Sequence, residues 1–120
     1  MNRNWDTIRD VLIATESLEQ DETLSLRDFD SGRASEISYH VELLAESGLL
    51  NVTLKKRIGK GPKDFFIRRL TWAGHEFLDA IRDESVWSKT KSKIMSKGGS
   101  MTFDLVKDVA ISIIKSALGL

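Results

Sequence analysis

One segment constrains the fold of this chain more than any other: a helical pattern, an alternating run, a glycine-rich turn and a second helical pattern follow one another. The apolar spacing predicts a helix over residues 35–47, and Gly48 suits the left-handed conformation that ends a helix. Residues 50–58 then alternate between apolar and polar side chains, as a strand with one solvated face does. This order predicts an α+β fold, specifically a winged helix-turn-helix.

The wing is predicted from its turn. Residues 59–62 read Gly-Lys-Gly-Pro, and proline is excluded from the interior of a central strand, so the chain must turn here. Residues 65–70 then form the returning strand, which gives two strands. A short alternating segment at residues 23–26 predicts a third.

Helices are predicted on both sides of the wing. The first follows Asn4, a suitable N-cap, and another follows Thr71 and continues weakly to residue 94. Two glycines at residues 98–99 break that helix, and Ser100 or Thr102 caps a last one. Aromatic residues at helical spacing are usually core residues, so the core is predicted to include Trp72, Phe77 and Trp87. The expected organisation is a winged-helix domain over residues 1–83 and a C-terminal helical extension over residues 84–120.

Composition excludes several classes of protein. The 120 residues include no cysteine, so a disulfide framework, a thiolate zinc site and a thiol nucleophile are all excluded. The amino-terminal residues lack the apolar core of a signal peptide, and no apolar run approaches the roughly 20 residues of a membrane span. The expected location is the cytoplasm.

Charge is distributed unevenly along a chain whose net charge is zero. Residues 1–50 hold four basic and eleven acidic side chains, whereas residues 51–120 hold fourteen basic and seven acidic ones. Such a division predicts either a basic surface for an anionic partner or opposite faces that pair on folding.

Two segments carry a resemblance to a known family. They are residues 39–50 (Tyr-His-Val-Glu-Leu-Leu-Ala-Glu-Ser-Gly-Leu-Leu) and residues 70–83, which contain Thr-Trp-x-Gly-His-x-Phe-Leu. Together with Trp87 and residues 98–103, they resemble a family of small bacterial and prophage proteins known as domain of unknown function 2513. The likeness covers nearly the whole chain. The Leu-x-x-Ser-Gly-Leu-Leu and Leu-Thr-x-x-Gly elements are more distantly similar to bacterial winged-helix repressors. The resemblance implies a fold but no activity.

The wing is the strongest candidate for nucleic-acid contact, because its cations face only one carboxylate, that of Asp64. Cations spaced along a hairpin are suited to phosphates, and about four such contacts would give a slope of log affinity against log salt of roughly −3 to −4. The alternative is a solvated hairpin whose lysines prevent edge-to-edge aggregation, or one that packs on the acidic half of a second copy. The candidate residues are Lys55, Lys56, Arg57, Lys60, Lys63, Arg68 and Arg69.

The helix over residues 35–47 is the element that a winged helix would place in the major groove. Its candidate contacts are Ser38, Tyr39, His40 and Glu42, and a glutamate such as Glu42 could accept from a cytosine amine. Glu36, Glu42 and Glu46 nevertheless argue against this placement, since only Arg33 precedes them as compensation.

Catalysis, metal binding and cofactor binding are not predicted. His40 and His75 are the only histidines, so a metal would have to recruit carboxylates from scattered elements. The turn at residues 59–62 lacks the longer glycine frame of a P-loop, and Ser47 lacks the strand-to-helix frame of a nucleophile elbow.

The last helix has a wider apolar arc than one packing face needs, which predicts a homodimer. Attachment to a membrane surface is the minor alternative, disfavoured because the polar stripe holds as many acids as lysines. The predicted interface residues are Phe103, Val106, Ala110, Ile113, Ile114, Ala117 and Leu118.

These features predict a small DNA-binding protein, a transcriptional regulator of bacterial or phage origin that contacts phosphates through a basic wing. The competing hypothesis is a non-catalytic protein-interaction adaptor that reuses the fold without binding DNA. The basic wing favours the regulator and the acidic helix favours the adaptor.

Overall fold

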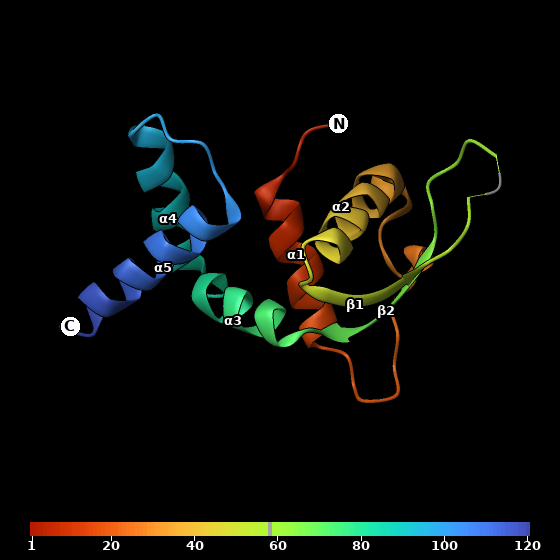
Figure 1. The fold of residues 1–120 in the computed structure, drawn as a ribbon, viewed down its shortest axis with the longest axis horizontal. Helices are drawn as coiled ribbons and strands as arrows, with labels where there is room; N and C mark the ends of the chain where they lie inside the picture. The colour runs from red at the N-terminus through yellow and green to blue at the C-terminus, as the bar shows by residue number, and fades with distance from the viewer. Residues whose placement is uncertain (58) are drawn as a thin grey trace. The chain divides into compact units, whose positions relative to one another are not determined.

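The computed structural model describes residues 1–57 and 59–120, and over these residues the chain is an α+β protein with five α-helices and one two-stranded antiparallel sheet (Figure 1). The chain divides into two compact units, residues 1–75 and residues 76–120. The elements are α1 (Trp5–Glu16), α2 (Ala34–Glu46), β1 (Leu50–Leu54), β2 (Phe65–Leu70), α3 (Trp72–Ile81), α4 (Glu84–Ser96) and α5 (Phe103–Ala117).

The first helix forms where its cap and its apolar spacing predict it. The Asn4 side chain accepts hydrogen bonds from the backbone N–H groups of Asp6 and Thr7 at 3.0 and 3.2 Å, so two otherwise unpaired donors are satisfied. Its buried stripe includes Val11 and Leu12, and α1 packs against α2 and β2. The core of the first unit is therefore built between two helices and the sheet.

The predicted strand at residues 23–26 is wrong except at one position. Leu24 forms an isolated antiparallel bridge with Ile67 of β2, and the chain then turns into a short 3-10 helix, Leu26–Asp28. The physical reason is competition for backbone donors. The Asp28 carboxylate accepts from Ser25 N–H at 2.7 Å, and the Asp64 carboxylate accepts from Leu26 N–H at 3.0 Å. Because these side chains take the backbone donors, the backbone pairing with β2 does not continue beyond Leu24.

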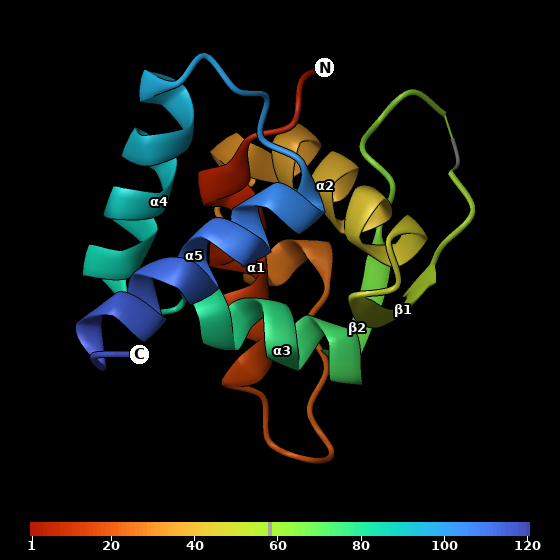
Figure 2. The same ribbon diagram turned by 60° about the vertical axis from the view of Figure 1, so that its left-hand side comes forward.

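The two strands predicted for the hairpin are present and pair with each other. β1 and β2 pair in antiparallel register from Leu50 opposite Leu70 to Leu54 opposite Phe65, with an irregularity between Asn51 and Val52. β1 ends four residues before the predicted limit, and Ile58, where the predicted strand ends, lies outside the described residues. The described residues between the strands project beyond the sheet (Figures 1 and 2). We call residues 55–64, without Ile58, the wing.

The two segments that carried the family resemblance meet at one joint. Gly48 ends α2 with a φ of +77°, and its carbonyl accepts a hydrogen bond from the Thr71 hydroxyl at 2.6 Å. Thr71 Oγ1 in turn accepts from Gly74 N–H at 3.1 Å, so Thr71 caps α3 as predicted. A Cβ on Gly74 would lie 2.1 Å from the Leu49 carbonyl oxygen, so only glycine allows this approach. These motif residues therefore have a structural role.

The predicted single helix after Thr71 is instead two helices. α3 ends at Ile81, and the Asp83 side chain accepts from Val86 N–H at 2.9 Å to begin α4. The break occurs because the Asp83 carboxylate competes for backbone N–H groups. Aspartate is therefore favoured as an N-cap over a position inside a helix. The predicted break at residues 98–99 is confirmed: Gly98 has a φ of +69°, and Thr102 caps α5.

Phe77 and Trp87 are core residues as predicted, but Trp72 is not, because it is 79 % exposed. Phe77 stacks on Phe103 with 4.3 Å between ring centroids, which ties α3 to α5 within the second unit. Trp72 and Phe77 are five positions apart, about 140° around a helix, so both cannot face the same interior.

Candidate nucleic-acid interface

The wing and α2 enclose a shared hollow of about 220 Å³ on the surface of the first unit. Two predicted wing cations and three of the predicted contacts of α2 line it, so the structure brings together residues that lie some twenty positions apart. Lys55, Lys56 and Arg68 do not line it. The lining residues are Met1, Ser35, Ser38, Tyr39, Glu42, Arg57, Lys60, Gly61 and Pro62.

Two contacts fasten the wing to α2. Lys63 Nζ lies 2.9 Å from Glu42 Oε1, and the Ser38 hydroxyl donates to the Lys63 carbonyl oxygen at 2.6 Å. Ser38 is 6 % exposed and its hydroxyl already holds the wing, so it does not project outward as a free donor. Glu42 and Lys63 are likewise engaged with each other and are only partly exposed. We call these two contacts the latch.

The remaining wing cations differ in what surrounds them. Lys55 pairs with Asp64 at 3.5 Å, and its ammonium also lies 4.3 Å from the centre of the Phe66 ring. Lys56, Arg57 and Lys60 are exposed, and none of them forms an ion pair with the residues that the structure describes. These three are the cations most available to an anionic partner.

The arginines of β2 are exposed but oriented by hydrogen bonds. Arg68 Nη1 donates to Thr53 Oγ1 of β1 at 2.6 Å, and Arg69 Nη1 donates to the carbonyl oxygen of Leu70 at 3.1 Å. Neither bond neutralises the guanidinium charge, so both arginines extend the positive potential along the sheet.

Asp64, the only carboxylate of the wing, also has a structural task. Its pKa is lowered because Leu26 N–H donates to it, with further lowering from Phe65 N–H and Lys55, against the opposing effect of burial. Asp64 therefore stays ionised and holds the wing base to the segment before α2.

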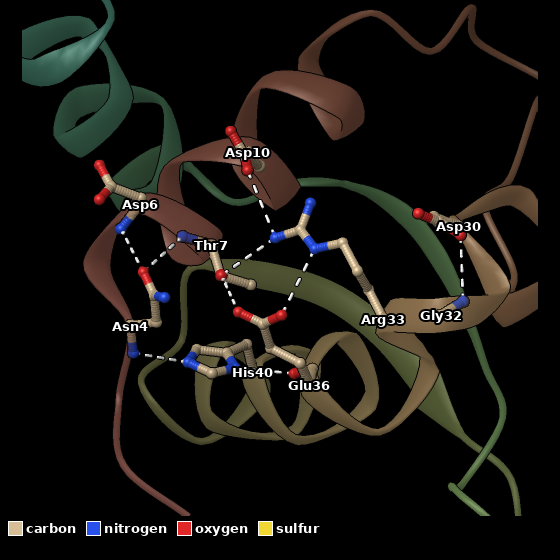
Figure 3. A network of polar contacts seen from close by, with 9 residues as sticks. All are labelled: Asn4, Asp6, Thr7, Asp10, Asp30, Gly32, Arg33, Glu36 and His40. Atoms are coloured by element: carbon tan, nitrogen blue, oxygen red, sulfur yellow. Dashed lines mark hydrogen bonds and ion pairs between the residues drawn. The ribbon is translucent and has the colours of Figure 1, made fainter.

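Glu36 is engaged inside the first unit and does not extend outward as a free carboxylate. The Thr7 hydroxyl and the Arg33 guanidinium both donate to it, the latter at 3.4 Å, and Arg33 also donates to Thr7 Oγ1 at 3.1 Å (Figure 3). The pKa of Glu36 is lowered chiefly by the Thr7 hydrogen bond and then by Arg33, against desolvation. Arg33 is consequently occupied, with Asp10 3.5 Å away as a further partner.

His40 is a buried structural residue. Its Nε2 accepts from the backbone N–H of Asn4 at 2.7 Å, so Nδ1 carries the proton and donates to the Glu36 carbonyl oxygen at 2.7 Å (Figure 3). The neutral ring thus joins the start of α1 to α2. Among residues 1–57 and 59–120, no group of three histidine or carboxylate side chains is placed to hold a metal ion.

The predicted dimer face of α5 is partly interior. Val106 and Ala110 are fully buried within the chain, so these two cannot meet a partner on the surface. Phe103 is half-buried and stacks on Phe77. Much of the wide apolar arc is therefore used within the chain, where α5 packs on α4. Ile113 and Ile114 are half-buried, and Ala117 and Leu118 are exposed.

Four lining residues of the hollow were not predicted. Ser35 lies one turn before Tyr39 on α2, so helical spacing from Tyr39 could have identified it. Gly61 and Pro62 were considered only as turn residues. Met1 precedes the first element, and no sequence pattern places it beside the wing.

Comparison with known proteins gives two matches. Residues 2–100 match the family model described as "Hypothetical protein (DUF2513)". An uncharacterised protein of Haemophilus influenzae is 39 % identical over 119 residues, which cover 98 % of this chain and 99 % of that relative. No solved structure matches the chain. Within the described parts of the chain, no helix combines the length and apolar character needed to cross a membrane.

Proposed function

The chain belongs to the DUF2513 family, and we propose that it is a non-enzymatic winged-helix protein that binds duplex DNA and acts as a transcriptional regulator. The order of elements supports the winged-helix assignment. Leu24 pairs with β2, β2 pairs with β1, and α2 immediately precedes β1, so a first strand position, a candidate reading helix and a wing follow in the order of that fold.

One observation carries the proposal: Arg57 and Lys60 of the wing line the same hollow as Tyr39 of α2. A duplex presents phosphates on both sides of its major groove, so a helix in the groove and a cationic hairpin on the flanking backbone must lie on one side of the protein. The hollow meets this requirement, and the latch fixes the separation of its two walls.

The carboxylates of α2, which argue against DNA in the sequence, are largely compensated. Glu36 is engaged by Thr7 and Arg33, and Glu42 is paired with Lys63. Only Glu46, at the C-terminal end of α2, is exposed without a partner among the described residues. Repulsion from phosphate is therefore concentrated at one end of the helix.

In the proposed complex, the wing supplies affinity and α2 supplies contacts in the groove. Lys56, Arg57 and Lys60 neutralise phosphates, which is independent of base sequence. Of the α2 residues that line the hollow, Tyr39 and Ser35 are the two that take no part in the latch. Ser38 and Glu42 act through the latch and not through bases, which revises their predicted role.

Binding to random duplex DNA tests this proposal. Retention is expected at about 50 mM salt and should weaken steeply toward 200 mM, with a slope of log affinity against log salt of about −2.7 for three phosphate contacts. The variant Lys56→Glu, Arg57→Glu, Lys60→Glu should lose retention. Failure of the wild-type chain to bind at low salt would reject the proposal.

A matched control separates local from overall charge. The variant Lys89→Glu, Lys93→Glu, Lys97→Glu carries the same change of charge on exposed positions of α4 and its C-cap. It should bind DNA nearly as the wild-type chain does. Equal losses in both variants would show that net charge, and not the wing, governs binding.

A protein-interaction adaptor is the second candidate, and one observation favours it. Trp72 is 79 % exposed at the start of α3, and exposed tryptophan is enriched at binding hot spots. Under this hypothesis the chain would show no DNA retention at low salt, and Trp72→Ala would leave the fold intact.

A homodimer through α5 also stays a prediction, now restricted to the accessible end of that helix. At the C-terminal end of the predicted face, Ile114 is half-buried and Leu118 is exposed, and neither lines the hollow against α4. Mass measurement in solution for the wild-type chain and Leu118→Glu tests it, since an unchanged monomeric mass in both would reject a dimer.

A further inference from the structure

The hairpin of α4 and α5 carries an open groove that the DNA proposal does not use. Two hollows, of about 170 and 380 Å³, share Lys93 and continue one another along the two helices. Both lie wholly within the second unit. The groove is lined by Lys89, Lys93, Ile94, Lys97, Gly99, Leu105, Val109, Ser112, Ile113, Ser116 and Ala117.

The groove has one cationic edge and one apolar wall. Lys89, Lys93 and Lys97 recur every four residues, so they form a single row about 12 Å long on the α4 side. Leu105, Val109 and Ile113 recur at similar spacing on α5 and form the opposite wall. The groove therefore has the length of two to three helical turns.

The lysines of this row lack counter-charges. No carboxylate is among the residues that line the two hollows, and none of the three lysines forms an ion pair with the residues the structure describes. Lys91, in contrast, lies outside the row, 5.3 Å from the centre of the Trp87 ring. Exposed like charges in a row repel one another unless a partner neutralises them.

We propose that this groove binds an acidic amphipathic helix of another protein. Its apolar residues, spaced i, i+4 and i+7, pack on Leu105, Val109 and Ile113, and its carboxylates along one flank pair with the lysine row. The apolar contact provides most of the affinity, whereas the exposed ion pairs fix orientation and speed association.

The charge pattern distinguishes this occupant from two others. A second copy docked groove to groove by two-fold symmetry would leave both lysine rows without counter-charges, because no carboxylate lines the groove. Nucleic acid would neutralise the lysines but leave the wall of Leu105 and Val109 in water, because phosphate offers no apolar surface. Only an amphipathic acidic segment satisfies both sides of the groove.

The test uses the full chain and a fluorescent synthetic helix of about 18 residues, long enough to be helical when bound, with Leu at i, i+4, i+7 and i+11 and Glu on one flank. Fluorescence anisotropy should report saturable binding. The variant Lys89→Glu, Lys93→Glu, Lys97→Glu should weaken binding about tenfold or more. Leu105→Ser, at a position already 38 % exposed, should weaken binding with an unchanged circular dichroism spectrum.

Charge reversal provides the sharpest control. A peptide with Lys in place of Glu should bind the glutamate variant and not the wild-type chain, which a merely structural defect would not produce. The wing variant Lys56→Glu, Arg57→Glu, Lys60→Glu, with an equal change of charge, should bind the acidic peptide as the wild-type chain does. This control also keeps the groove separable from the DNA proposal.

Several results would overturn the proposal. One is that a peptide of the same composition but scrambled apolar spacing binds equally well. Another is that neither groove variant changes binding. A third is that the chain binds vesicles of anionic phospholipid but not the peptide. Self-association that buries the groove would also overturn it. That would appear as a doubled mass in solution, lost in the Leu105→Ser variant.

Discussion

Lys63 Nζ lies 2.9 Å from Glu42 Oε1, so the last cation of the wing neutralises the carboxylate at the middle of α2. The two residues are 21 positions apart, and both are partly shielded from water. The pair has two effects: it holds the wing beside α2, and it removes a negative charge from the hollow that we propose faces DNA.

Removing only the Lys63 ammonium should lower the affinity for DNA. Lys63→Gln leaves the Glu42 carboxylate unpaired in the hollow, so DNA affinity should fall about fivefold, near 1 kcal/mol, although Lys63 contacts no phosphate. The salt slope should therefore stay at the wild-type value. The double variant Lys63→Gln, Glu42→Gln should recover most of the affinity, and a double variant as weak as the single one would contradict this role.

His40 should be needed for stability and not for binding. His40→Ala leaves the Asn4 N–H and the Glu36 carbonyl without their partner and opens a cavity, so the free energy of unfolding should fall by about 2–4 kcal/mol. His75→Ala is the matched control, because His75 is exposed and should change stability by less than about 0.5 kcal/mol. Urea unfolding measures both; equal effects would show that the buried hydrogen bonds contribute nothing.

Acid should destabilise the first unit. The pKa of Asp64 is lowered from its ordinary value of 3.8, first by Leu26 N–H, and the pKa of Glu36 is lowered from 4.5, first by the Thr7 hydroxyl. A carboxyl group with a lower pKa in the folded state binds more protons when unfolded. Its stabilisation is therefore complete above the unfolded pKa and is lost as the pH falls through the folded pKa.

The free energy of unfolding, measured with urea, should accordingly be steady from about pH 7 to 5 and decrease below about pH 4. Asp64→Asn should lower stability at neutral pH and flatten the decrease at acid pH. Glu46→Gln, at an exposed position, should keep the wild-type profile. An undiminished acid decrease in Asp64→Asn would show that this carboxylate is not responsible.

Gly74 should tolerate no side chain. A Cβ there would meet the Leu49 carbonyl oxygen at 2.1 Å, so Gly74→Ala should reduce the free energy of unfolding by roughly 1–3 kcal/mol despite the better helix propensity of alanine. Gly61→Ala is the control, since among the described residues no atom beyond its chain neighbours lies within 4 Å of the added Cβ. Thermal unfolding compares the two, and a stabilised Gly74→Ala variant would show that the joint can open without cost.

Local patterns predicted most of the elements. Asn4, Gly48 and Thr71 mark helix ends where the structure has them, because a cap acts on backbone groups within three or four residues. The errors arose where local signals compete. Asp28 turned a predicted strand into a 3-10 helix, and Asp83 began a new helix in what looked like one continuous pattern.

The candidate site was predicted less well, because exposure and ion pairing depend on contacts between distant residues. Ser38 was expected on the outside and lies under the wing, and Trp72 was expected in the core and faces water. Helical periodicity gives the direction of a side chain around its own helix, but not which other element covers it.

The sequence by itself determined the α+β elements, the hairpin with its basic turn and the absence of cysteine chemistry, since periodicity, turn residues and composition are properties of neighbouring residues. Only the tertiary structure decided which charges remain available. Lys63 meets Glu42 and Arg33 meets Thr7 and Asp10 only after the chain folds, so the cations left exposed on the wing could not be identified before the folded contacts were known.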